Sequence, residues 1–294
     1  MISTPVERAE MTLDHAPFAP FLDERLPGMA PLDEAEWLHR DAAFAPQMAY
    51  RDRLVALRPD VVIAGEGCAG SVELLAFVLD ALEAHDPAYA MEPDVATRPD
   101  GMPVPLDPAQ PFATLARLVQ EDLLLLEKPD GAAEHRLIGA ALLFPARWSL
   151  AEKMGRPLVE IHDRVPAYDG GLAPRVQRLF DALRPGRPLV RANWLVHGTN
   201  ELHQPKLFET SAKTQELTGR FWLRVERQCI LRLPESGAVV FSVKTCVTPI
   251  EALDEAQRFG LIEALEEQGE AMRDYHGGAA HSAAAATALR DLGG

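Results

Sequence analysis

The sequence has few cysteines, few basic residues for its number of acids, and no long uncharged apolar run. Its three cysteines, Cys68, Cys229 and Cys246, are widely separated and form no CxxC pair, which argues against a disulfide framework or a thiolate zinc site. Lys and Arg number 29 against 44 Asp and Glu, giving a formal net charge of -15. A nucleic-acid backbone is therefore not the expected partner, because such partners are bound by clustered basic side chains.

Neither a targeting segment nor a membrane span is expected. The first residues carry early acids and no apolar run, which excludes an ordinary signal peptide. No later stretch reaches about 18 uncharged apolar residues, the length that a spanning helix needs. Because no disulfide framework is expected either, we expect the cysteines to be reduced and the protein to be cytoplasmic.

The pattern of apolar residues divides the chain into a helical first half and a second half richer in strands. We expect an extended arm over residues 1–30, one α+β domain over 31–275, and a flexible Ala-rich tail over 276–294. Helical spacing predicts helices at residues 33–50, 71–85, 112–128, 149–155, 172–185 and 252–277. Strand-like runs occur at residues 136–148, 189–198, 220–234 and 238–250. Segregated elements of this kind predict a largely antiparallel sheet with flanking helices.

Three glycines, Gly65, Gly67 and Gly70, have the GxGxxG spacing of a dinucleotide-binding turn. After the next helix, however, the sequence shows neither a second strand nor a strand-terminal acid to hold a ribose. The motif therefore indicates a glycine-rich turn that starts a helix.

Histidines His162, His197 and His203 lie in the part of the chain that alternates strands and short helices. His162 precedes a Val-Pro pair, which restricts the local backbone. An imidazole held in this way can give one nitrogen to iron while a carbonyl or carboxylate orients the other. The alternative is structural, because a histidine at a helix or strand end often bonds backbone groups, and this alternative is stronger for His197.

The strand expected at 220–234 is unusually polar. Alternation places Arg224 and Glu226 on one face, together with Trp222, Gln228 and Ile230. If that face borders a pocket, Glu226 could receive a substrate ammonium, and Arg224 could hold the carboxylate ionised or pair with a cofactor acid. The alternative is an exposed cross-strand ion pair that contributes less than about 1 kcal/mol.

Cationic and aromatic residues also stand near the expected strand ends. Arg147 and Trp148 occur in FPARW, and Arg191 and Asn193 occur in RANW. Arginine suits the carboxylates of a tetrapyrrole, and tryptophan suits its apolar face. Core aromatic residues and rim arginines would explain the same residues without a cofactor.

Two motifs carry a resemblance to a known family. W-x-x-x-E-K-x-G-R-P-L-x-x-I-H-x-x-V-P covers residues 148–166, and R-V-E-R-Q-x-x-L-R-L-P covers residues 224–234. With the sequence around them, from about residue 28 to about residue 253, the chain resembles the alpha subunit of the haem-dependent oxidative N-demethylase family.

The resemblance implies a haem in a PAS-like core near residues 134–250, with a histidine on the iron and dioxygen activated opposite it. It favours His162 as the iron ligand, with His197 as the alternative, and Arg147, Trp148, Arg191 and Asn193 as further cofactor contacts. Glu226 and Arg224 are then candidate catalytic residues on the distal side. Glu226 would bind the protonated amine or accept a proton from it.

The same resemblance implies a monooxygenase that removes a methyl group from a small alkylamine such as dimethylamine. The products would be methylamine and formaldehyde. Electrons from NADPH would come through a reductase subunit that carries FMN and an iron–sulfur cluster. Two alternatives remain: a haem or gas sensor without turnover, which is disfavoured by the lack of a visible output domain, and an interaction scaffold that binds no haem.

Overall fold

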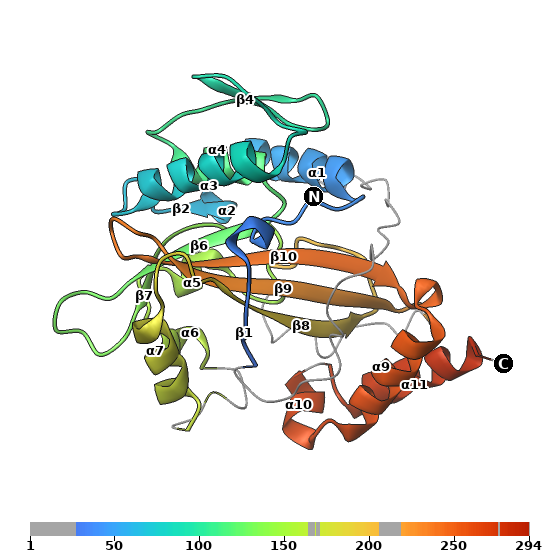
Figure 1. Ribbon diagram of the computed structural model, residues 1–294. Coiled ribbons are helices and arrows are strands. Elements are labelled where there is room, and N and C mark those ends of the chain that lie inside the picture. The colour runs from blue at the N-terminus through green and yellow to red at the C-terminus, as the bar shows by residue number, and fades with distance from the viewer. Residues whose placement is uncertain (1–27, 164–167, 169–170, 206–218, 276, 294) are drawn as a thin grey trace.

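The computed structural model describes residues 28–163, 168, 171–205, 219–275 and 277–293 (Figure 1). Most of the expected N-terminal arm lies outside these residues. The described part is an α+β fold built on a seven-stranded antiparallel sheet in the order β1-β8-β9-β10-β6-β7-β2. The strands of this sheet are β1 Ala30–Pro31, β2 Ile63–Ala64, β6 Asp122–Glu127, β7 Arg136–Ala141, β8 Leu189–His197, β9 Trp222–Arg232 and β10 Val239–Pro249. The predicted fold class, α+β with a large antiparallel sheet, is confirmed.

The last three strands, β8, β9 and β10, are neighbours in the sheet and lie close to the ranges that the sequence predicts. Strands β9 and β10 are 11 residues each and pair along their whole length. Glu226 of β9 lies opposite Thr245 of β10 on one side and Asn193 of β8 on the other. The predicted alternation therefore becomes a row of polar side chains across three strands.

Helices from the first half of the chain cover one face of the sheet (Figure 1). They are α1 Phe44–Leu57, α2 Pro59–Val62, α3 Ser71–His85 and α4 Pro111–Leu118, and beside them lies a small sheet of β3 Ala90–Met91, β4 Val95–Thr97 and β5 Pro103–Pro105. Gly70 precedes α3 with a φ of 82°, which makes the glycine motif a turn before a helix. The strands after α3 are short and antiparallel, so this region forms no βαβ unit.

Two predicted helices have different bounds in the structure. Asp33 caps only the short 3-10 helix Glu34–Glu36, and the long helix α1 begins at Phe44, where the Asp41 carbonyl accepts the Phe44 N–H. The helix expected over residues 112–128 is wrong in its second half, because residues 122–127 form β6. The leucines of β6 are buried on both sides of the sheet between β10 and β7. Strand pairing there outweighs the helix propensity of leucine.

The other face of the sheet carries α5 Leu150–Lys153, α6 Leu158–Ile161 and α7 Ala173–Ala182 (Figure 1). Leu158 and Phe180 from these helices pack with Ile230 of β9 in one apolar cluster. Sheet and helices are thereby held together on this face.

The C-terminal helices lie at one end of the sheet (Figure 1). The long helix expected at 252–277 is divided into α9 Glu255–Glu267 and α10 Glu270–Tyr275, preceded by the short 3-10 helix Ile250–Ala252. The segment expected as a flexible tail instead forms α11 Ala279–Asp291, whose Leu289 is buried in a cluster with Leu261 of α9. No helix among the described residues is both long and apolar enough to span a membrane.

Candidate functional site

A cavity of about 860 Å³ lies on the face of the sheet that carries α5, α6 and α7. Its floor comes from strands β6 and β8–β10, and the junction between α9 and α10 supplies part of its wall through Glu267, Gln268, Gly269 and Met272. The volume is within the range of about 300–1,000 Å³ typical of ligand pockets. Apolar residues of the wall include Leu124, Leu126, Leu137, Leu158, Ile161, Phe180, Ile230 and Phe241.

His162 lines this cavity at the end of α6. Its Nδ1 lies 2.8 Å from the carbonyl oxygen of Leu158, and its ring stacks on that of Tyr168, with centroids 4.3 Å apart and planes inclined by 15°. Burial is the largest influence on the ring and lowers the pKa of His162 to about 4. The imidazole is therefore neutral at pH 7, with its proton on Nδ1, where a carbonyl accepts it. Nε2 is then the nitrogen with a lone pair for a metal.

The other two histidines are placed differently. His197, at the end of β8, is 1% exposed and does not line the cavity. His203 also lies outside the cavity, and its Nδ1 is 2.7 Å from the Leu143 carbonyl oxygen. Among the three candidates, only His162 faces a volume that can hold a large cofactor. The Val-Pro pair after it lies outside the described residues.

Glu226 lies on the cavity floor and is held by its neighbours. Its Oε1 accepts from Arg224 Nε at 3.1 Å, and its Oε2 accepts from Gln228 Nε2 at 3.1 Å and from Asn193 Nδ2 at 3.5 Å. The side chain keeps 13% of its exposure. A carboxylate fixed in this way presents negative charge to the cavity, and it can bind a cation or accept a proton.

Arg224 is not at the cavity surface and is 1% exposed. Besides Glu226, its guanidinium donates to the carbonyl oxygens of Leu202 at 3.1 Å and Phe144 at 2.5 Å. It therefore holds Glu226 without itself lining the cavity. Of the two roles that the sequence allows for Arg224, the structure supports the one in which it holds the carboxylate.

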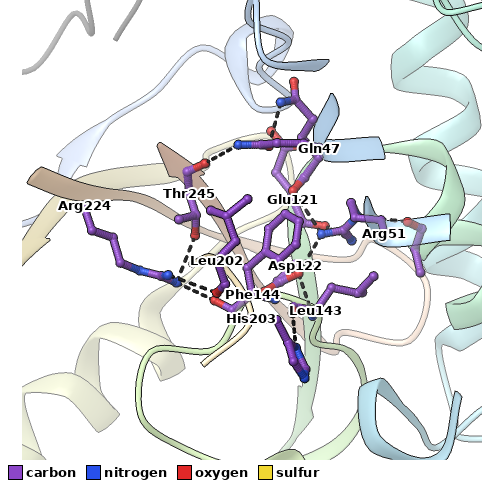
Figure 2. Close-up of polar contacts among 12 residues, drawn as sticks. Gln47, Arg51, Glu121, Asp122, Leu143, Phe144, Leu202, His203, Arg224 and Thr245 are labelled. Atoms are coloured by element: carbon purple, nitrogen blue, oxygen red, sulfur yellow. Dashed lines mark hydrogen bonds and ion pairs between the residues drawn. The ribbon is translucent and has the colours of Figure 1, made fainter. Parts of the chain in front are cut away.

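The same guanidinium helps to fix the segment that follows β7. Figure 2 shows Phe144 between Arg224 on one side and Asp122 with Arg51 on the other. Asp122 accepts the backbone N–H groups of Leu143 and Phe144 at 2.9 and 2.8 Å, and it pairs with Arg51 at 2.8 Å. Both members of this ion pair are at most 1% exposed, and breaking such a buried pair is strongly destabilising. Asp122 therefore fixes the backbone at Leu143 and Phe144.

Shortly after Leu143 and Phe144 the chain reaches Arg147 and Trp148, which both line the cavity. Arg147 has a φ of 63°, the only described residue other than glycine with a positive φ, and its N–H donates to the Gln204 carbonyl at 2.8 Å. Such a conformation costs about 1–3 kcal/mol and is maintained by surrounding contacts. The strained backbone at Arg147 therefore lies in the wall of the cavity.

Arg191 and Asn193 line the cavity from β8, as expected if that strand end borders a ligand. Arg191 Nε donates to Gln228 Oε1 at 2.7 Å, which links it through Gln228 to Glu226. The sequence did not indicate Lys153, Arg156 or Tyr168, although each lines the cavity. Lys153 and Arg156 belong to the motif E-K-x-G-R-P, and their place in this motif could have identified them as cavity residues.

These residues fit a haem. A neutral imidazole with a carbonyl-bonded Nδ1 could bind the haem iron, leucine and tryptophan side chains could pack on the apolar macrocycle, and a cationic rim could pair with its two carboxylates. This cationic rim consists of Arg147, Lys153, Arg156 and Arg191. Acidic residues line the same cavity, among them Glu226 and Asp163, and Asp163 pairs with Lys153 at 3.3 Å.

The chain was compared with known protein families. A family model described as haem-dependent oxidative N-demethylase, alpha subunit-like, matches residues 28–286. The match covers the whole sheet, every residue of the cavity wall named above, and the first part of α11. It extends past residue 253, where the resemblance seen in the sequence ends.

Proposed function

Because this chain belongs to the haem-dependent oxidative N-demethylase, alpha subunit-like family, we propose that it is the catalytic haem subunit of a multicomponent monooxygenase. Its substrate would be a small secondary or tertiary alkylamine such as dimethylamine. The observation that carries the proposal is one cavity that is lined by both a neutral imidazole, His162, and an anchored carboxylate, Glu226. We further propose that residues 134–250 hold the haem as a PAS-like core.

His162 would bind the haem iron through Nε2, because Nδ1 is engaged by the Leu158 carbonyl. Arg147 and Arg191 would pair with the haem carboxylates, and Trp148 would pack on the macrocycle. When bound, the haem supplies the activation of dioxygen and the oxidation of the N-methyl group.

Glu226 has two proposed tasks. At neutral pH a dialkylamine is a cation, and the carboxylate would hold its ammonium by a charge-assisted hydrogen bond. The nitrogen must lose a proton before it can give up electron density, and Glu226 Oε2 is the proposed acceptor of that proton. Arg224 holds the carboxylate through Oε1 and Gln228 holds it through Oε2, so the amine would approach Glu226 from the cavity side as a further donor.

The remaining wall would orient the substrate and exclude water. Val243, which lies opposite Gln228 on β10, gives the floor an apolar residue near Glu226, and it would suit the methyl groups of the amine. The balanced reaction takes dimethylamine, one dioxygen, two electrons and two protons to methylamine, formaldehyde and water. Electrons would come from NADPH through a reductase subunit that carries flavin and an iron–sulfur cluster.

The direct test is product formation by the haem-reconstituted subunit with dimethylamine, dioxygen, NADPH and a flavin and iron–sulfur reductase. We expect formaldehyde and methylamine in equal amounts, matched to the dioxygen consumed. A protein that binds haem and amine, is reduced by the reductase, and releases no formaldehyde would be a sensor, and the proposed activity would be wrong.

A further inference from the structure

Tyr168 is a cavity residue whose hydroxyl has no hydrogen-bond partner among the described residues, although the oxygen is buried. Its ring lies parallel to the His162 imidazole, with centroids 4.3 Å apart. A buried hydroxyl without a partner is unusual and calls for an explanation, such as a bound group that the protein alone does not contain. The cavity is the place from which such a partner would approach.

The surroundings of this hydroxyl indicate the kind of partner. A phenol ordinarily has a pKa of about 10, so the hydroxyl keeps its proton at neutral pH and can donate it. Arg191 lines the same cavity from β8, as His162 and Tyr168 also do. A phenol donor and a guanidinium on the wall of one cavity can together bind an anion.

We propose that the Tyr168 hydroxyl, together with Arg191, binds one carboxylate of the haem, while the Tyr168 ring holds the His162 imidazole in its plane. This inference rests on the proposed haem site and adds a residue with two separable roles. The hydroxyl role depends on the charge of the cofactor carboxylate, whereas the stacking role depends only on the ring. The phenol thus links the orientation of the iron ligand to the seating of the macrocycle.

The two roles predict different results for two substitutions. Tyr168→Phe keeps the stacked ring and removes only the donor, whereas Tyr168→Leu removes both. Tyr50→Phe is a matched control, because the Tyr50 hydroxyl bonds Glu201 outside the cavity. Thermal unfolding of each apoprotein checks that the fold is retained.

The experiment measures Kd for haem and for haem dimethyl ester by titration at the Soret band. A lost hydrogen bond to a charged group corresponds to about a tenfold weaker Kd. We expect Tyr168→Phe to weaken binding of haem about tenfold and to leave binding of the ester within about twofold. Tyr168→Leu should weaken both, and Tyr50→Phe neither.

Three outcomes would count against the account, and they differ. If Tyr168→Phe binds haem as tightly as the wild type, the hydroxyl does not hold the carboxylate. If it weakens haem and ester equally, its role is packing alone, and the inference is overturned. If the wild type binds neither form, the proposed haem function itself fails.

Discussion

Replacing Glu226 with Gln removes one negative charge from the cavity and keeps the size of the side chain. In the wild type, Oε1 is held by Arg224 Nε at 3.1 Å, so the charge lies at a fixed position. The side chain is 13% exposed, so the surrounding water weakens its field only in part. The variant therefore tests whether this particular charge binds the amine.

The magnitude follows from the charge and its surroundings. Two unit charges about 4 Å apart attract by about 4 kcal/mol at an effective dielectric constant of about 20. Desolvation of the ammonium offsets part of this attraction, and a hydrogen bond to a charged group contributes about 1.5–3 kcal/mol net. The Kd for dimethylammonium should rise about 10- to 100-fold.

The assay is a titration of the haem-reconstituted protein with dimethylamine, followed by the change in the Soret band. Glu263→Gln on the exposed side of α9 makes the same charge change away from the cavity and should leave the Kd unchanged. Arg224 keeps its carbonyl acceptors in Phe144 and Leu202, so the variant should remain folded, which urea unfolding verifies. An amine Kd within about twofold of the wild type in folded Glu226→Gln would refute the reasoning.

Three further predictions concern stability. Burial lowers the pKa of His162 from 6.5 to about 4. Between these pH values the unfolded chain binds a proton at His162 and the folded chain does not, so the apoprotein should lose stability as pH falls from about 6.5 toward 4. Urea unfolding of His162→Gln should show a smaller loss of stability over the same pH range. Asp122→Asn breaks a fully buried ion pair and should lower the free energy of unfolding in urea by about 3–5 kcal/mol. Asp86→Asn, in a more exposed pair with Arg40, should lower it by less than about 1 kcal/mol. Similar losses of stability in the two variants would contradict the burial argument. Leu289→Ala in α11 should cost about 2–5 kcal/mol, and Leu292→Ala, at a residue 39% exposed, should cost far less; equal and small effects would mean that α11 does not pack as described.

The sequence alone predicted the strands of the second half well, and the reason is local. Alternation along residues 222–232 separates Glu226 from Arg227, and the structure places these residues on opposite faces of β9, where Arg227 donates to the carbonyl oxygens of Glu36 and Trp37. The prediction failed at β6, where the apolar run has no polar alternation. Whether such a run is helix or strand depends on its neighbours, which are distant in sequence.

The cavity could be predicted only in part, because it is assembled by tertiary contacts. Its polar floor follows from strand alternation, and the position of His162 follows from the family resemblance. Asp122 and Arg224 hold the backbone of Phe144, three residues before Arg147, and no local sequence pattern predicts these contacts. The wall from the α9–α10 junction was also missed, because periodicity gave no sign of the helix break at Gly269.

The most direct test of the central claim is the visible spectrum of the haem-reconstituted protein, recorded for the wild type and for His162→Ala, before and after addition of dimethylamine. We predict a Soret band in the wild type that dimethylamine shifts, and its loss or displacement in His162→Ala. His197→Ala serves as the matched control and should retain the wild-type spectrum. A wild type that binds no haem, or a His162→Ala protein whose spectrum equals that of the wild type, would contradict the account.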